Sequence, residues 1–210
     1  KVIEITETNK KQYAPALYDL TKLQRDCNRI FGYSAKHTLS IMQRLYENYK
    51  VLTYPRTDSR YITKDIVPTI KDRLRAISVS NYTKSTAEIL KGNIVPNKSF
   101  VDDSKVSDHD AMIPTEQKVR MGILSAEERN VYDLVIKRFL SVLLPPFEFI
   151  QTGVKVKVSE EIFRAKGKVI TAKGWKMVYD KIDDLEETSE DGALKEQVLP
   201  KLVKGDKLKI

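Results

Sequence analysis

Two kinds of apolar spacing occupy this chain, and Pro145 and Pro146 mark a sharp boundary between them. Before the prolines, Ser125 and Glu128 have the spacing of a capping box at the start of an amphipathic helix. After them, Val154–Val158 alternates apolar and cationic residues, as an antiparallel strand with one solvated face does. The chain is therefore predicted to be α+β. The residues expected to face inward from the helix are Val131, Leu134, Val135, Phe139 and Val142.

Further helices are predicted upstream from their capping residues. Asp19 is a good N-cap for a helix that ends before Gly32, and Ser34 can cap the next one. A third helix can start at Thr63, and a short one is expected near 86–91. The expected inward positions of the first two helices are Leu20, Leu23, Cys27, Ile30, Ala35, Thr38, Met42, Leu45, Tyr46 and Tyr49.

The simplest arrangement is a mainly helical domain, 16–143, inserted between β segments, 1–15 and 144–210, that pair as part of an antiparallel β arch. An acidic loop with six carboxylates is predicted over Asp183–Gly192. The missing initiator methionine and the strand-like sequences at both ends, Val2–Ile5 and Asp206–Ile210, suggest a piece of a longer polypeptide. Two further strands are predicted between them, over Phe163–Ile170 and Trp175–Tyr179.

The composition favours an anionic partner. The 210 residues carry a net charge of +8, and 16–143 hold 21 Lys and Arg against 15 Asp and Glu, so most of the excess lies there. A single cysteine, Cys27, excludes an internal disulfide, and the two histidines make an imidazole metal site improbable. The sequence contains no apolar run long enough to span a membrane or serve as a signal peptide, which predicts a cytoplasmic protein.

A tyrosine in the segment Leu52–Arg60 is a candidate for phosphoryl transfer. Tyr54 lies between hydroxyl-bearing residues, and Arg56 follows two positions later. Tyrosine is a weak nucleophile, so an enzyme that uses one must stabilise the phenolate and the phosphorane, and a guanidinium can do so. Pro55 disfavours helical geometry at Tyr54, which predicts a loop that presents the phenol. A structural tyrosine is the alternative.

A second polar segment supplies an imidazole. His109 lies between Asp108 and Asp110, and a carboxylate beside an imidazole can favour the cation that would contact a phosphate. A surface histidine in an acidic loop is the alternative. Gln43 and Glu47 are four residues apart and share a helix face, so they could orient substrate or remain ordinary solvated residues.

Several segments, in order, resemble the central region of type IA DNA topoisomerases, in particular the bacterial topoisomerase III group. The resemblance extends more weakly through Phe163–Gly167 and Gly174–Trp175. Any one of the motifs alone would be a weak signal, whereas five in order are specific. The five motifs are Leu17–Gln24, Phe31–Ala35, Gln43–Glu47, Leu52–Arg60 and His109–Thr115.

The resemblance implies that Tyr54 attacks a backbone phosphate of single-stranded DNA, which forms a 5′-phosphotyrosine link and a free 3′-hydroxyl. Strand passage through the reversible break would allow relaxation or decatenation without ATP. By the same resemblance, Arg56 steadies the phosphate charge and His109 contacts the scissile phosphate. The supporting, DNA-contacting positions that it implies are Gln43, Glu47, Thr53, Thr57 and Asp58.

The family's metal-binding Toprim domain is absent from this sequence, as are the remaining domains. The resemblance implies that Toprim carboxylates bind Mg²⁺ in the full-length enzyme, so we expect no metal or cofactor in this segment and little DNA cleavage by it alone. The expected partners are single-stranded DNA and the missing domains of the same polypeptide. A nucleoid-associated cytoplasmic protein with no membrane partner is also implied.

Two other readings compete with the resemblance. Tyrosine recombinases and rolling-circle nickases are disfavoured, because recombinases place their histidine and arginines before the tyrosine and nickases need a histidine-rich metal motif. A non-catalytic basic module that binds single-stranded DNA is the main alternative.

Overall fold

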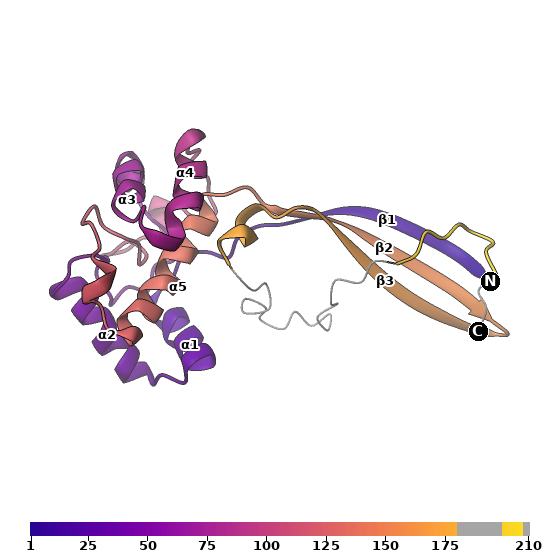
Figure 1. Ribbon diagram of the computed structural model, residues 1–210, viewed down its shortest axis with the longest axis horizontal. Coiled ribbons are helices and arrows are strands. Elements are labelled where there is room, and N and C mark those ends of the chain that lie inside the picture. Colours follow the sequence, from indigo (N-terminus) through magenta and orange to yellow (C-terminus); the bar gives the residue numbers. More distant parts are fainter. Residues whose placement is uncertain (180–198, 208–210) are drawn as a thin grey trace. The chain divides into compact units, whose positions relative to one another are not determined.

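A computed structural model of the chain describes residues 1–179 and 199–207 (Figure 1). They form two compact units. The sheet unit contains Lys1–Tyr13, Pro146–Gly174 and 199–207, and the helical unit contains Ala14–Pro145 and 175–179. The predicted acidic loop and residues 208–210 of the predicted last strand lie outside the described residues.

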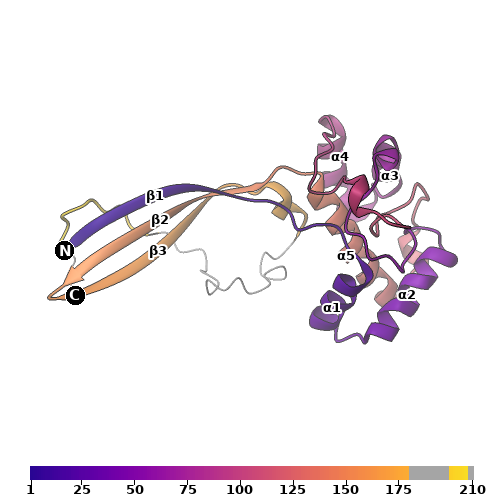
Figure 2. The same ribbon diagram turned by 180° about the vertical axis from the view of Figure 1, so that it is seen from behind.

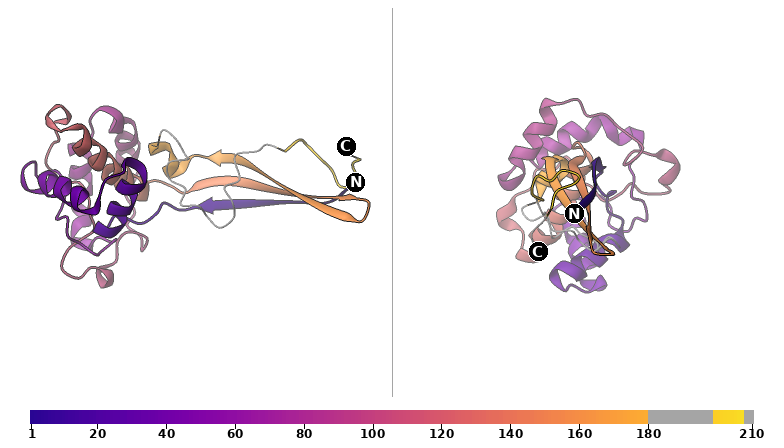
Figure 3. Two further views of the ribbon diagram at one scale, coloured as in Figure 1. Left: turned by 90° about the horizontal axis from the view of Figure 1, so that it is seen from below. Right: turned by 90° about the vertical axis from the view of Figure 1, so that its right-hand side faces the viewer.

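The sheet unit is built on three antiparallel strands in the order β1-β2-β3, which run side by side in Figure 3. They are β1 (Val2–Gln12), β2 (Phe147–Val158) and β3 (Glu161–Ala172). The pairing of β1 with β2 joins segments far apart in the sequence, with Ile5 opposite Val154. β1 is longer than the predicted Val2–Ile5, because polar residues extend the backbone ladder without an apolar pattern to reveal it.

The predicted strand over Val154–Val158 is confirmed within β2. Val154 is buried and Lys157 is exposed, but Lys155, Val156 and Val158 are all half-buried, so the two faces differ less than the alternation predicts. The predicted strand Trp175–Tyr179 is wrong. Gly174 takes a positive φ of 47° and begins a short 3₁₀ helix, Gly174–Val178, whose residues from Trp175 on belong to the helical unit. The physical reason is packing: the Trp175 N–H donates to the Pro145 carbonyl at 2.9 Å, and its ring packs edge-on against Tyr179. In an extended strand these two residues, four positions apart, would lie about 13 Å from each other, too far for their rings to meet.

The helical unit contains α1 (Leu20–Phe31), α2 (Ala35–Glu47), α3 (Ile70–Ala76), α4 (Thr83–Lys91) and α5 (Ala126–Val142). Helices α1, α2 and α5 pack together, as Figure 2 shows from behind. The predicted caps are confirmed. Asp19 accepts from the Lys22 N–H at 2.6 Å, Ser34 accepts from the His37 N–H at 3.1 Å, and Ser125 and Glu128 form the capping box.

Four expectations for the helices need correction: the start of the third helix and three positions expected to face inward. The predicted third helix begins as a 3₁₀ helix, Lys64–Thr69, and becomes α-helical only at Ile70, because Pro68 has no N–H to donate to an α-helical turn. Ile30 and Tyr46 are each 36% exposed, and Ala35 is also exposed. The buried stripe of each helix is therefore narrower than its apolar spacing predicts.

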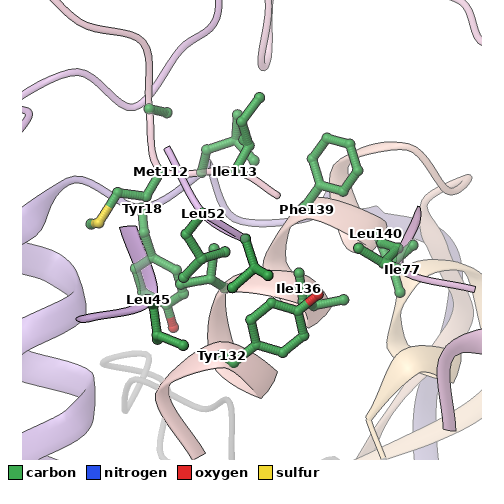
Figure 4. Packing of buried hydrophobic residues seen from close by; sticks show 14 of the residues in the cluster. Tyr18, Leu45, Leu52, Ile77, Met112, Ile113, Tyr132, Ile136, Phe139 and Leu140 are labelled. Carbon is green, nitrogen blue, oxygen red and sulfur yellow. The ribbon is translucent and has the colours of Figure 1, made fainter. Parts of the chain in front are cut away.

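The core of the helical unit lies against α5. Figure 4 shows Tyr132, Ile136 and Phe139 of this helix among buried side chains from α2 and from the segments around Leu52 and Ile113. A Leu or Phe side chain of this kind contributes about 1.5–3 kcal/mol when it is fully buried. Helix α5 thus fixes the two loop segments that carry the predicted chemistry.

A buried polar network joins α1 to α5. The Tyr18 hydroxyl donates to Asp26 at 2.8 Å, and Arg138 donates to that hydroxyl at 2.9 Å and to Asp26 at 3.4 Å. The Arg138 guanidinium also lies 4.2 Å from the centre of the Tyr18 ring. Burial raises the pKa of Tyr18 well above its ordinary value, so its hydroxyl stays protonated and available as a donor.

In the part of the chain that the structure describes, no helix is long and apolar enough to span a membrane.

Candidate active site

The segment after α2 is held to a second segment by the hydroxyl of Thr53. This hydroxyl donates to the Ala111 carbonyl at 3.2 Å and accepts from the Ile113 N–H at 3.0 Å. The Thr53 N–H donates to the Ile113 carbonyl at 3.0 Å, and Leu52 forms an antiparallel bridge with Pro114. Residues 52–53 and 111–114 are therefore paired, although nearly sixty positions separate them in the chain.

Thr57 makes a second connection to the same segment. Its buried hydroxyl donates to the His109 carbonyl at 3.1 Å and accepts from the Ser59 N–H at 3.1 Å. The Thr57 carbonyl accepts from the Leu20 N–H at the start of α1. Asp58 accepts from the Ser107 hydroxyl at 3.4 Å. Through these bonds, Thr57 fixes the backbone that carries the imidazole.

These connections place the predicted tyrosine beside the predicted histidine. The rings of Tyr54 and His109 have centroids 4.3 Å apart with planes inclined at 41°. Tyr46, from the last turn of α2, also contacts Tyr54, edge-on, with ring centroids 5.5 Å apart. Tyr54 is half-buried outside any helix, and His109 is exposed. The expected loop with a presented phenol is thus what the structure shows.

An open pocket of about 820 Å³ lies over these rings. Its lining contains one ammonium group, one carboxylate and one imidazole, so an anionic ligand would meet cationic and hydrogen-bonding groups beside the phenol. The predicted residue Glu47 lies on this lining. The lining residues are Tyr46, Glu47, Lys50, Leu52, Thr53, Tyr54, His109 and Thr115.

Arg56 and Gln43 are not brought to this lining. The Arg56 side chain is exposed, and its guanidinium has no hydrogen bond or ion pair with any described residue, so it is available to a ligand. Gln43 is half-buried in α2. Asp110, one of the two carboxylates that flank the imidazole in the sequence, accepts from the Thr63 N–H at 2.7 Å. Its carboxylate therefore supports the next helical segment.

Sequence reasoning missed Arg73, a buried residue of α3. Its guanidinium donates to the Pro114 carbonyl at 2.6 Å and pairs with Glu116 at 2.9 Å. Burial lowers the pKa of Arg73, while the nearby Glu116 and Asp110 carboxylates oppose that shift. Arg73 thus fixes the end of the segment that begins at His109. Its only sequence signal was a charged residue inside an apolar helical stripe. The other residues missed at the pocket are Tyr46, Lys50, Leu52 and Thr115.

Cys27 is not a competing nucleophile. It is buried in α1, as predicted, and burial raises the pKa of its thiol to about 12. Over residues 1–179 and 199–207, no cluster of three or more His, Cys, Asp or Glu side chains could hold a metal ion. These residues therefore do not fit the Mg²⁺ ion that the resemblance implies.

Comparison with known proteins shows which family the chain resembles. A family model described as DNA topoisomerase matches residues 1–210. Proteins named DNA topoisomerase 3 are 53% identical in Bacillus licheniformis and 50% identical in Bacillus subtilis, in each case over 209 residues that cover 100% of this chain. The chain spans only 28% of the length of these relatives.

A solved structure shares the fold. Full-length topoisomerase I from Thermotoga maritima matches with a TM-score of 0.64 at 20% identity, over 93% of this chain and 31% of that one. The full-length family match and the high identity to the Bacillus proteins agree with the order of motifs in the sequence. The chain therefore belongs to the type IA DNA topoisomerases, on the topoisomerase III side of the family.

Proposed function

We propose that Tyr54 is the nucleophile with which the full-length protein cleaves and rejoins single-stranded DNA. The observation that carries this proposal is the contact of Tyr54 with His109 at an open pocket. Family membership supports it, because the same two residues lie in motifs that resemble those of type IA enzymes.

In the proposed reaction, the Tyr54 phenol oxygen attacks the phosphorus of a backbone phosphate and loses its proton. The bond from phosphorus to the 3′ oxygen breaks, and that oxygen takes up a proton to become a free 3′-hydroxyl. A 5′-phosphotyrosine ester replaces the broken phosphodiester. One ester is exchanged for another, so the reverse reaction rejoins the strand without ATP. Strand passage between the two steps gives relaxation or decatenation.

Charge stabilisation is the main demand of such a step, because negative charge builds on the phosphoryl oxygens. We assign it to Arg56, whose exposed guanidinium is available to a phosphate, and to His109, which lies against the nucleophile. Thr53 and Thr57 support the site by holding its two segments together. Glu47 is proposed to contact DNA from the pocket lining. Gln43 and Asp58, which are not on the lining, are proposed to support the site from neighbouring positions.

We also propose how this chain relates to the whole enzyme. The helical unit is the domain that carries the nucleophile, and the sheet segments Lys1–Tyr13 and Pro146–Gly174 belong to a β arch. Because the resemblance assigns Mg²⁺ binding to another domain of the full-length protein, we expect this chain alone to cleave DNA poorly.

The test is Tyr54→Phe in the full-length protein. Single-stranded DNA labelled at its 3′ end is incubated with protein and Mg²⁺, and the products are separated under denaturing conditions. We expect a labelled covalent adduct with the wild-type protein and none with Tyr54→Phe, while DNA binding is retained. Tyr13→Phe, at a tyrosine that is 70% exposed, is the control and should form the adduct normally. An undiminished adduct and normal relaxation by Tyr54→Phe would refute the proposal and favour a basic DNA-binding module.

A further inference from the structure

Lys50 adopts a backbone conformation that lysine rarely takes. Its φ is 56°, in the left-handed region, just beyond the end of α2. Helix α1 ends in the same region with Gly32, whose φ is 74°. Glycine is the usual residue at such a position, because a side chain there crowds the following carbonyl. The chain thus places a long cationic side chain at a turn where a glycine would be less strained.

The turn at Lys50 is fixed by the segment that carries His109. The Thr115 hydroxyl donates to the Lys50 carbonyl, and the Thr115 N–H donates to the Val51 carbonyl at 3.1 Å. The Val51 N–H in turn donates to the Leu45 carbonyl of α2 at 3.0 Å. The backbone at Lys50 is therefore held from both sides, which defines where its side chain starts.

Lys50 also lies on the pocket that Tyr54 and His109 share. It is the one ammonium group among the lining residues, and its side chain is exposed. Glu47 supplies the only carboxylate of that lining, and Lys50 forms no ion pair with it or with any other described residue. A strained residue on this pocket, whose charge is paired with no described residue, points to a ligand of opposite charge.

We propose that Lys50 binds a backbone phosphate of the DNA strand in this pocket, and so positions the strand for attack by Tyr54. The ammonium acts as a flexible point charge, which suits a phosphate beside the reacting one, whereas a planar guanidinium suits a fixed two-point contact. The inference rests on the proposed function, because it assumes that the pocket takes DNA. It adds a binding residue that neither the motifs nor the resemblance indicated.

The test compares Lys50→Gly with Lys50→Arg in the full-length protein. Glycine removes the ammonium and relaxes the backbone, so the fold should be preserved, and unchanged thermal unfolding confirms this. Both substitutions are made in a Tyr54→Phe background, which prevents covalent trapping. Binding of a fluorescent single-stranded oligonucleotide is measured by anisotropy over a series of salt concentrations. Lys91→Gln in α4, which removes one exposed positive charge elsewhere, is the matched control.

We expect Lys50→Gly to weaken binding about two- to fivefold, the range for one exposed ion pair. The dependence of log affinity on log salt should become shallower by about 0.7, the value for one phosphate contact on a single strand. Lys50→Arg keeps the positive charge and should retain the affinity and the salt dependence of the parent protein. Lys91→Gln should also change neither quantity.

Two results would overturn the inference: unchanged affinity and salt dependence in Lys50→Gly, or an equal loss in Lys91→Gln. Adduct formation with Tyr54 intact is scored separately. If the adduct forms and Lys50→Gly binds normally, only the role of Lys50 fails. If no adduct forms in any variant, the proposed function fails, whatever the binding data show.

Discussion

The sheet unit and the helical unit connect distant parts of the chain by different means. In the sheet, β1 and β2 are joined by a regular backbone ladder in which side chains alternate between the two faces. At the candidate active site, the hydroxyls of Thr53 and Thr57 and the guanidinium of Arg73 bind carbonyl groups of another segment. A ladder tolerates many side chains, whereas the site depends on a few particular ones.

The largest effect is expected for Arg138→Met in α5, which tests whether the helical unit depends on individual side chains. The substitution leaves the buried Asp26 carboxylate without its cationic partner from α5, so we expect the helical unit to lose about 3–5 kcal/mol of unfolding free energy. Fluorescence during urea unfolding reports on this unit, because Trp175 is the only tryptophan and lies buried within it.

The double variant Arg138→Met with Asp26→Leu is the control for this experiment. It removes both charges, so most of the lost stability should return. If Arg138→Met alone changed stability by less than about 1 kcal/mol, the network would not be a main source of stability in the helical unit.

A smaller effect is expected for Thr57→Val, which keeps the side-chain shape and removes the hydroxyl. The His109 carbonyl loses a donor and the Ser59 N–H loses an acceptor, at a cost of about 1–3 kcal/mol. Because the backbone at His109 is then less fixed, adduct formation in the full-length protein should fall more than DNA binding does. Thr63→Val is the matched control, since the Thr63 side chain makes no capping hydrogen bond. Equal losses in the two variants would contradict a positioning role for Thr57.

The smallest effect is expected in the sheet. Lys155→Thr removes an exposed ion pair between β2 and Glu4 of β1 and leaves the ladder intact. The unfolding free energy should change by no more than about 0.5 kcal/mol, as measured by circular dichroism during urea unfolding. A loss as large as that of Thr57→Val would show that the sheet, too, depends on individual side chains.

The same contrast explains how much of the molecule the sequence predicts. Helix starts at Asp19, Ser34 and Ser125 follow from caps that act within one turn, and the strand over Val154–Val158 follows from strict alternation. Both are local signals. Arg73 could not be recognised in this way, because its partner carbonyl at Pro114 is forty-one positions away and carries no sequence mark.

The candidate site shows an intermediate case. Residue chemistry and the resemblance both single out Tyr54 and His109, and the structure brings their rings into contact, which the sequence does not predict. Lys50 cannot be recognised from the sequence, because what distinguishes it is a positive φ, and a sequence indicates a positive φ only where glycine or asparagine occupies the position. The sequence predicts that Tyr46 faces the core, because an aromatic residue at helical spacing usually packs inward, whereas in the structure it lines the pocket.

The short helix at Trp175 has a consequence for how the chain is divided. The polypeptide passes from one unit to the other at 13–14, at 145–146 and at 174–175, and again after Tyr179. The units are therefore two by packing but share several covalent connections. A protease that cuts the backbone at any one of these crossings leaves them linked, so neither unit can be released, or exchanged with another copy, by breaking a single connection.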